Sequence, residues 1–522
     1  MNDVYQDLLN TARQPGSPTS LFIENMGKLV DLATDMNQEE GLIQAITAIE
    51  TQLPNMAHPD LKRCAHYFLG GGWTSLYRLR YGKGDESWGW EREEIEKEIF
   101  HLRSAVRNAD AYTGKDDLLP RIYTNLGNVM SHVGRFIEAI DYWAKALEIV
   151  PGYGMAIGNL GEGLCNYTKY FYNVDGGVTE IFLHEAHRML VQALEKPLEG
   201  DAAVDFRKHV QSIESRLDPG FLNRPLELDL GHSLGDGEEG RYRKWCLDNK
   251  LFLNPLNDLG PHSIAASDSV QCRSVVTRVD TGPIYHGLFS QIKQEYVSAR
   301  FLFFDGLFSD DVHYSDRRVS LVNTLDFPAF CLSTEKQKLA FRSAYSILDK
   351  IAFFLNQYMG LDIPEHEVSI KRIWYEKRGK KPQLRDVFSN LQNWSLRGLF
   401  WLAKDIWEDS SEYRNAIEPD AQGLRDIRNH LEHKYLKVHD RLWNPPTQTK
   451  EESRRGLSDT LAYSIGREEF AFKGMKMLRL ARAALMYLAF GIQEGEARQV
   501  DERRGKRILP MLLDDWEDEW KR

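Results

Sequence analysis

The sequence predicts an all-α protein in which an N-terminal helical solenoid is followed by a C-terminal helical bundle. Three observations support this fold class. Apolar residues recur every three or four positions through most of the chain, as they do along one face of a helix. The N-terminal part contains a repeat, and residues 216–282 are rich in helix-breaking glycine and proline. Because 522 residues are too many for one compact core, we expect more than one domain.

The N-terminal repeat is clearest at 123–151, where the pattern predicts two helices joined by a short turn. Leu126-Gly127 lies in the first of these helices, and Leu160-Gly161 follows 34 residues later. This period, with small residues where paired helices touch, resembles the tetratricopeptide (TPR) repeat. TPR arrays commonly bind other proteins, so we expect a protein or peptide partner on this part of the chain.

The other repeat units diverge from this pattern. The second helix of the next unit is expected at 184–197, after an insertion of about a dozen residues. The segments 68–73 and 101–112 are expected to form one divergent unit with another insertion, and 21–36 one more unit. We therefore interpret residues 1–215 as an irregular TPR-like helical repeat domain.

Residues 216–282 change in character. The segments LELDL (226–230) and SVVTRV (274–279) are expected to form short strands. Between them, residues 241–261 are dense in aromatic residues, asparagine and proline. We interpret 216–282 as a linker that packs on a neighbouring domain.

Residues 283–495 predict a helical bundle, and residues 496–522 a charged C-terminal tail. The second helix of the bundle is expected to begin at a capping box formed by Thr334 and Gln337. Asp349 and Lys350 interrupt its apolar stripe, which predicts either a pair near the functional site or an ion pair at the edge of the core. The expected helices cover 291–308, 334–359, 391–407, 419–437 and 467–492.

Charge and cysteine content exclude several classes of protein. The net charge of −11 argues against indiscriminate nucleic-acid binding, although it permits a local basic groove. The chain has no phosphate-binding G-x-x-x-x-G-K-[ST] loop, and its five scattered cysteines lack metal-ligand or disulfide spacing. We therefore expect no cofactor and no metal.

The chain is expected to reside in the cytoplasm and not to contact a membrane. Its start lacks the basic and apolar regions of a secretory signal. The apolar stretch 470–492 contains four basic residues, a density that is typical of a core helix with one solvated side.

The stretch RDIRNHLEHKY (425–435) places several chemically active groups on one predicted helix. Asn429 and His433 are four residues apart and share a face, and the long side chain of Arg428 can reach the same edge. An imidazole can move a proton at neutral pH, and a guanidinium can bind a phosphate. These groups suit cleavage of RNA by its own 2′-hydroxyl. The apolar side of the helix is expected to comprise Leu424, Ile427, Leu431 and Tyr435.

Arg428-Asn429-x-x-x-His433 resembles the R-(polar)-x-x-x-H motif of HEPN-domain ribonucleases, which lies on a late helix of a helical bundle. Together with the helical repeats and the segment 241–259, it resembles the TPR-fused branch of that superfamily. The resemblance implies a metal-independent endoribonuclease with Arg428, Asn429 and His433 as catalytic residues. It also implies a homodimer in which two copies of the motif face each other. The implied role is that of a bacterial toxin or an antiviral defence protein that cuts transfer or messenger RNA.

Two other interpretations of this helix remain open. Arg425-Asp426-x-x-x-His430 satisfies the same pattern three residues earlier, and we prefer the later pair because asparagine follows its arginine, the commoner family form. Arg425 and His430 are then expected to line the site. Asp426, His430 and His433 also have a spacing that would permit metal ligation, but no second ligand cluster is evident.

The run KRIWYEKRGKKPQLR (371–385) is the best candidate for RNA binding, because it contains seven basic residues and one acidic residue. Its basic side chains are expected to bind phosphates while its aromatic rings stack on bases. The alternative is a solvated loop between helices. The expected RNA-binding residues are Lys371, Arg372, Trp374, Lys377, Arg378, Lys380 and Lys381.

These features predict an endoribonuclease of the HEPN type whose repeat domain senses a trigger or a partner. The alternative function is a non-enzymatic TPR scaffold whose bundle only dimerises, because a fold alone does not establish an activity.

Overall fold

A computed structural model of the whole chain shows mainly helices, with two small two-stranded sheets. The all-α prediction is confirmed. None of the described helices has an apolar stretch long enough to cross a membrane. The structure describes residues 2–14, 16–82, 85–107, 118–171, 177–272, 275–278, 280–309, 311–322, 324, 326–378, 381–407, 421–439, 461–502, 508–511, 513–514 and 516–521.

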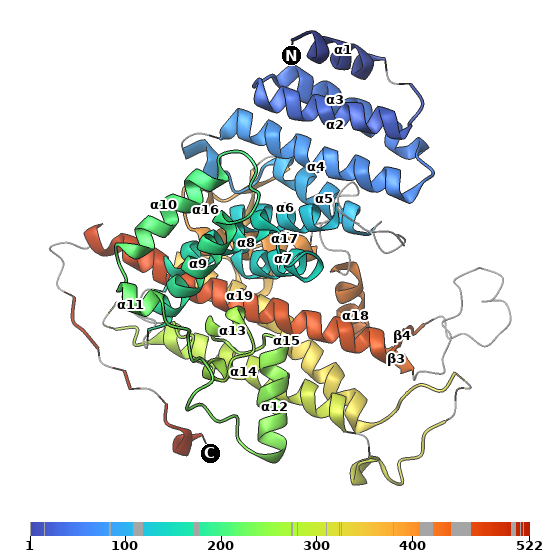
Figure 1. Cartoon of the computed structure of the whole chain (residues 1–522). Coiled ribbons are helices and arrows are strands. Elements are labelled where there is room, and N and C mark those ends of the chain that lie inside the picture. The colour runs from blue at the N-terminus through green and yellow to red at the C-terminus, as the bar shows by residue number, and fades with distance from the viewer. Residues whose placement is uncertain are drawn as a thin grey trace.

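The first four helices form an antiparallel stack at one end of the molecule (Figure 1). Their apolar faces form a core of their own, which is separate from the core of the rest of the chain. Thr19 begins the second helix, because its side-chain oxygen accepts a hydrogen bond from the backbone N–H of Phe22 at 3.2 Å. The helices are α1 (Asn2–Arg13), α2 (Ser20–Asp35), α3 (Glu39–Gln52) and α4 (Pro59–Tyr81).

The stack continues with further helix pairs, as the repeat pattern predicts. Trp143 fills the contact between two of these pairs. A Cβ atom at Gly127 would lie 2.4 Å from its indole Nε1, and one at Gly163 would lie 2.3 Å from its ring, so both positions require glycine. The helices are α5 (Glu93–Arg107), α6 (Leu119–His132), α7 (Phe136–Ile149), α8 (Gly154–Thr168), α9 (Val178–Leu194) and α10 (Ala202–Glu214).

The segment after the repeats contains short helices, and the described residues of the two expected strands are not in strands. Residues 228–230 make a turn, and 226–227 and 275–278 are irregular. In the described part of the chain no strand pairs with them, and Asp229 accepts a hydrogen bond from the Ser263 N–H at 2.6 Å. The helices are α11 (Pro219–Leu222), α12 (Gly237–Asp248) and α13 (Leu256–Leu259).

Residues 241–261 contact both the repeats and the bundle. Asn257 is fully buried, and its side chain bonds the backbone of Leu247, Phe252 and Gly260, which fixes the loop. Asp258 accepts from Arg482 of the bundle at 2.7 Å and from the Tyr167 hydroxyl of α8 at 3.0 Å. One carboxylate therefore connects both parts of the chain.

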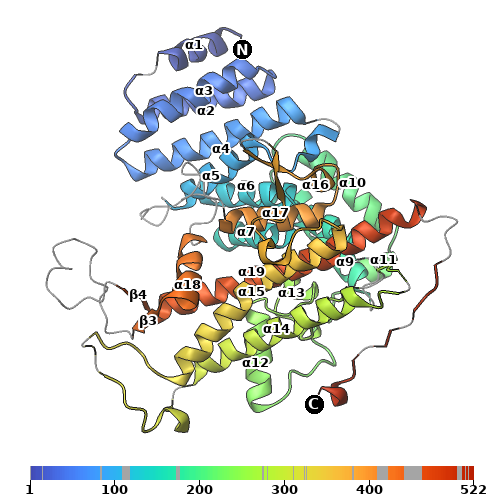
Figure 2. The same cartoon turned by 180° about the vertical axis from the view of Figure 1, so that it is seen from behind.

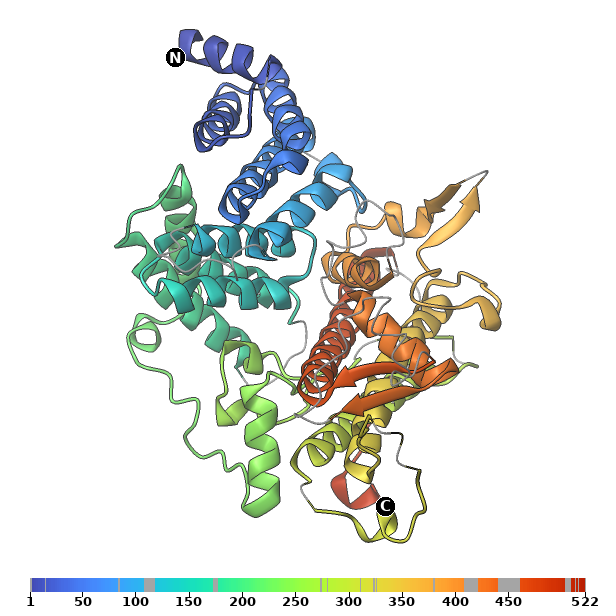
Figure 3. The same ribbon diagram turned by 90° about the vertical axis from the view of Figure 1, so that its right-hand side faces the viewer.

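The C-terminal bundle is built from long helices and lies beside the repeats (Figures 2 and 3). Its second helix begins two residues before the predicted capping box, with Cys331 at the N-cap. The capping-box prediction is wrong because Thr334 and Gln337 are buried inside the helix, where the Gln337 amide donates to the Gly306 carbonyl at 2.9 Å. The helices are α14 (Ile284–Phe308), α15 (Leu332–Met359), α16 (Asp386–Ser389), α17 (Trp394–Trp407), α18 (Ala421–His433) and α19 (Arg467–Glu502).

Two small sheets flank the bundle. The strands β1 (Tyr375–Arg378) and β2 (Lys381–Leu384) form an antiparallel hairpin, and β3 (Leu436–His439) and β4 (Tyr463–Gly466) pair in parallel. The helix expected at 419–437 therefore ends at His433, because the chain turns to enter β3.

Helix α17 is the main contact between the bundle and the repeats. Asp405, with a side chain only 2% exposed, accepts two hydrogen bonds of 3.0 Å from Arg103 and a further one from Arg135. The backbones of Gly134 and Gly398 meet so closely that a Cβ on either would lie 2.1 Å from a backbone oxygen of the other segment. The apolar core runs from Tyr77 to Ile492, so it crosses the domain boundaries that the sequence predicts at 215 and 282.

Replacing Asp405 with asparagine is expected to destabilise the protein by about 3 kcal/mol, because the buried Arg103 loses this carboxylate partner and the buried Arg135 keeps only its pair with Glu138. Thermal or urea unfolding of Asp405→Asn would measure this loss. Asp205→Asn is the matched control, because Asp205 forms an exposed ion pair with Lys208 within α10. Equal stability of the two variants would contradict the proposed role of Asp405.

Glu98 of α5 predicts how stability depends on pH. Burial raises the pKa of this carboxyl from 4.5 to about 7, against smaller opposing effects of Thr74 and Arg78. Between pH 4.5 and about 7, the folded protein therefore keeps a proton on Glu98 that the unfolded chain releases. The contribution of Glu98 to the free energy of unfolding falls as the pH rises through this range. Glu98→Gln mimics the protonated form and should raise the unfolding free energy by roughly 3 kcal/mol at pH 8, and by much less at pH 5. A pH-independent difference in melting temperature would refute this.

Candidate functional site

Helix α18 is held against the bundle by one apolar face. Leu424 and Ile427 are fully buried, as predicted. Gly423 allows a close approach to α19, because a Cβ there would lie 2.4 Å from the Lys473 ammonium nitrogen. This packing turns the opposite face of the helix outward.

The predicted apolar face is shorter than expected. Leu431 is half-buried, and Tyr435 is 44% exposed because it lies beyond the helix. The Tyr435 carbonyl accepts a hydrogen bond from the Tyr463 N–H at 3.2 Å, so its backbone leads into the β3–β4 sheet. The helical period therefore predicts burial correctly only up to the end of α18 at His433.

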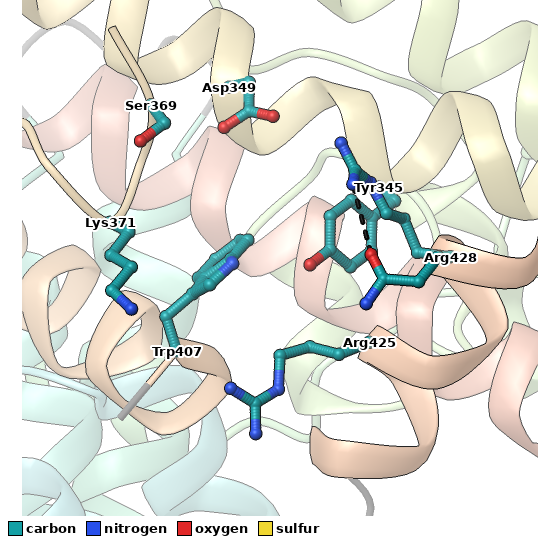
Figure 4. A pocket seen from close by; sticks show the side chains of 8 residues that line it. Tyr345, Asp349, Ser369, Lys371, Trp407, Arg425 and Arg428 are labelled. Atoms are coloured by element: carbon teal, nitrogen blue, oxygen red, sulfur yellow. Dashed lines mark hydrogen bonds between the residues drawn. The ribbon is translucent and has the colours of Figure 1, made fainter. Parts of the chain in front are cut away.

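A pocket of about 290 Å³ opens beside α18 (Figure 4). It combines three basic side chains with a carboxylate, a hydroxyl and two aromatic rings. Helices α15, α17 and α18 and the turn at 369–371 each contribute to it. The lining residues are Tyr345, Asp349, Ser369, Lys371, Trp407, Arg425, Arg428 and Asn429.

Arg428 and Asn429 lie together at one side of this pocket. The guanidinium donates a hydrogen bond to the Asn429 side-chain oxygen at 3.2 Å (dashed in Figure 4). The guanidinium carbon also lies 5.7 Å from the centre of the Tyr345 ring, within the range of a cation–π interaction. Two neighbours thus orient a group that can bind a phosphate in a fork.

His433 is exposed one turn further along α18 and does not line the pocket. The adjoining Glu432 accepts two hydrogen bonds from Arg342 of α15, at 3.0 and 3.1 Å. Arg342 lowers the pKa of Glu432, and the charges of Arg428 and His433 act in the same direction. Arg428, Glu432 and His433 therefore share one charged, exposed region.

His430 occupies a different environment. Its ring nitrogen Nδ1 donates a hydrogen bond to the Asp426 carbonyl at 2.7 Å, and its ring lies 5.1 Å from that of Tyr463. Of the earlier motif, only Arg425 lines the pocket. In the described part of the chain, no three histidine, cysteine or acidic side chains are grouped closely enough to hold a metal ion. Asp426, His430 and His433 therefore do not form such a group.

The pocket also contains residues to which the sequence analysis gave no role in the site. Tyr345 belongs to the predicted apolar stripe and Trp407 ends α17, so neither position marks a site from periodicity alone. Lys350 pairs with Glu295 of α14, whereas Asp349 faces the pocket. Burial raises the pKa of Asp349, although the Ile370 N–H, which donates to its carboxylate at 3.2 Å, opposes the shift.

The predicted RNA-binding run has two kinds of side chain. Lys371, Arg372 and Lys377 are exposed, and Lys371 reaches the pocket. Trp374 is 1% exposed and packs against Trp90, Phe388 and Phe400, so its expected stacking on a base is wrong. The side chains of Arg378, Lys380 and Lys381 lie outside the described residues.

Comparison with protein families identifies the bundle. Residues 276–495 match the model of the LA2681-like HEPN family, so the C-terminal part of the chain is a HEPN domain. Helix α18 lies within the matched region. No curated protein and no solved structure matches the chain. The family match does not extend to the repeats, whose TPR assignment stays a prediction.

The burial of Trp374 generates a stability prediction. Trp374→Ala is expected to cost about 3–5 kcal/mol, because it removes a large ring from a close-packed aromatic cluster. Lys377→Ala, three residues away on an exposed strand, should change stability by less than about 0.5 kcal/mol. Chemical denaturation of both variants measures the difference, and a mild effect at Trp374 would show that its ring is dispensable to the core.

Proposed function

We propose that this protein is a metal-independent endoribonuclease that uses Arg428, Asn429 and His433. One observation carries the proposal: in a HEPN domain, α18 presents an oriented arginine and asparagine at a cationic pocket, with an exposed imidazole one turn away. Arg425 and Lys371 add positive charge at the same pocket, so a phosphate backbone finds a local basic site on an acidic protein.

The chemistry requires two proton transfers and charge stabilisation. The ribose 2′-oxygen attacks the adjacent phosphorus and loses its proton to a base, and the bond from phosphorus to the 5′-oxygen breaks. An acid returns a proton to that oxygen, which leaves a 2′,3′-cyclic phosphate and a 5′-hydroxyl. His433 supplies one of these proton transfers. Arg428 stabilises the charge that develops on the phosphoryl oxygens, and Asn429 holds Arg428 in place.

The second proton transfer is the reason to propose a homodimer. Each copy of α18 contributes one His433, and His430 bonds to its own helix at Nδ1. Because His433 is exposed, the outward face of α18 is accessible to a second copy. A facing copy would then supply the other imidazole, as the resemblance to HEPN ribonucleases implies.

We further propose that the helical repeats, as a TPR-like domain, bind a protein or peptide that controls cleavage of transfer or messenger RNA in bacterial defence. The support is the contact through α17. Lys404 and Asp405 of this helix pair with Glu91, Glu96, Arg103 and Arg135 of the repeats, while Trp407 lines the pocket. A shift of the repeats would therefore act on a helix that ends at the site.

The alternative function is a non-enzymatic scaffold with a dimerising bundle. The grouping of cations, carboxamide and imidazole on α18 favours the enzyme, because a purely structural interface gains nothing from desolvating so many charges.

The test is to incubate the purified protein with total cellular RNA in excess EDTA and to sequence the new ends. The wild type should produce discrete cuts that end in 2′,3′-cyclic phosphate. His433→Ala should reduce the rate by at least about 10²-fold, because it removes a proton-transfer group.

His430→Ala is the matched control, since it removes an imidazole three residues away on the same helix. It should retain most of the cleavage. Loss of activity in His430→Ala but not in His433→Ala would transfer the role to the earlier motif, and cuts abolished by EDTA would indicate a metal-dependent enzyme. Absence of cuts from the wild type, also when it is expressed in cells under phage challenge, would support the scaffold.

A further inference from the structure

The pocket beside α18 contains an acceptor group that phosphate binding does not explain. A carboxylate repels a phosphate, yet Asp349 points into the same space as Arg425, Arg428 and Lys371 (Figure 4). A ligand that fits this pocket must therefore offer hydrogen-bond donors at one end and negative charge at the other. A nucleotide has this character, because its base carries N–H groups and its phosphates carry charge.

We propose that this pocket binds one guanosine nucleotide of the RNA, with Asp349 reading the base and the basic side chains holding an adjacent phosphate. The inference rests on the proposed function, because it identifies the nucleotide next to the cleaved phosphate. It goes further in assigning a base-specificity residue to the site.

The carboxylate of Asp349 can distinguish the four bases because it accepts hydrogen bonds and donates none. An ionised carboxylate only accepts hydrogen bonds. Guanine presents two adjacent donors, N1–H and the N2 amino group, along one edge. Adenine and cytosine place an unprotonated ring nitrogen beside their single amino group, and uracil flanks its N3–H with two carbonyls. Only guanine therefore offers a carboxylate two adjacent donors, and its O6 acceptor beside them is left for a separate donor.

The surroundings of Asp349 hold this acceptor in place. The Ile370 N–H donates to one carboxylate oxygen at 3.2 Å and fixes the orientation of the group. The Ser369 hydroxyl lies at the same end of the pocket and can donate to guanine O6. The guanine N1–H and N2 amino groups would thus face the acceptor Asp349, and the neighbouring O6 would face the donor Ser369.

Two aromatic rings provide a surface for the base. Trp407 ends α17 and presents its indole to the pocket between Asp349 and Arg425 (Figure 4). Its ring lies 5.5 Å from that of Tyr345 at an angle of 71°, so the two rings pack edge to face and limit each other's rotation. Bases stack on such side chains in single-stranded RNA.

The size of the pocket suits one nucleotide better than a larger ligand. Its volume of about 290 Å³ lies just below the range for ligand pockets, roughly 300–1,000 Å³. Arg425 and Arg428 lie on α18, across the pocket from Ser369 and Lys371 (Figure 4). Arg428 and Asn429 are bonded to each other there. A base at Asp349 would therefore place its phosphate at the residues proposed for catalysis.

The test uses nucleoside 3′,5′-bisphosphates, which carry a phosphate on either side of the ribose. Isothermal titration of the wild-type protein in EDTA should show guanosine 3′,5′-bisphosphate binding at least tenfold more tightly than the adenosine, cytidine and uridine compounds. Equal affinity for all four compounds, or binding of none of them, would overturn the proposal.

Asp349→Asn keeps the shape of the side chain but replaces one acceptor with a donor. The ratio of guanosine to adenosine affinity should fall at least fivefold, even if the loss of negative charge strengthens phosphate binding overall. Glu335→Gln is the control, because Glu335 pairs with Lys338 on the same helix away from the pocket, and it should keep the wild-type ratio. An unchanged ratio in Asp349→Asn, with wild-type melting behaviour, would remove Asp349 from base recognition.

Binding of these compounds does not depend on cleavage, so the two proposals fail separately. Guanosine preference without RNA cutting would leave the pocket assignment intact and refute the nuclease. Cutting without guanosine preference would do the reverse. If both hold, guanosine should be enriched next to the mapped cuts, and Asp349→Asn should abolish that enrichment while cutting continues.

Discussion

The arrangement of this protein depends on the burial of charged side chains between the repeats and the HEPN domain. Asp405 lies between Arg103 and Arg135, and Asp258 lies between Arg482 and Tyr167. Burying such groups is costly unless every partner is present, so each network permits one relative placement of the helices that it joins. Because Asp405 lies two residues before Trp407, the same constraint fixes one wall of the pocket.

The pocket beside α18 concentrates positive charge on a protein that is acidic overall. Its positive charge comes from Arg425 and Arg428 of α18 and from Lys371 of the turn at 369–371. Local charge of this kind acts over about a Debye length, which is roughly 8–10 Å at physiological salt. The overall charge of −11 therefore disfavours the binding of an anion elsewhere on the surface, but it does not cancel the attraction of an anion to the pocket.

The sequence predicted the helices well and the tertiary environment of single residues poorly. The period of apolar residues located α14, α15, α17, α18 and α19, and it identified Leu424 and Ile427 as core. It could not show that Trp374 is buried, because the rings that cover it come from residues 90, 388 and 400. For the same reason, composition predicted strands at 226–230 and 274–279, although in the described residues no strand pairs with 226–230 or 275–278.

The pocket was only partly predictable. Arg425, Arg428 and Asn429 stand together in the sequence, and their chemistry marks them. Ser369 and Trp407 join them only through tertiary packing, which no local pattern encodes, whereas the interruption of an apolar stripe had marked Asp349 as one of two alternatives. The choice between His430 and His433 also depends on contacts with Asp426, Glu432 and Tyr463 rather than on spacing.

The central claim is that the attacking nucleophile is the ribose 2′-hydroxyl and that α18 moves its proton. The most direct test is to map one cut in a short RNA and then to replace that single ribose with 2′-deoxyribose, with EDTA present throughout. Complete loss of cutting at that bond, with cutting retained at the other sites, is the expected result. Continued cutting at the substituted bond would show that water attacks instead, and would contradict the mechanism assigned to Arg428, Asn429 and His433.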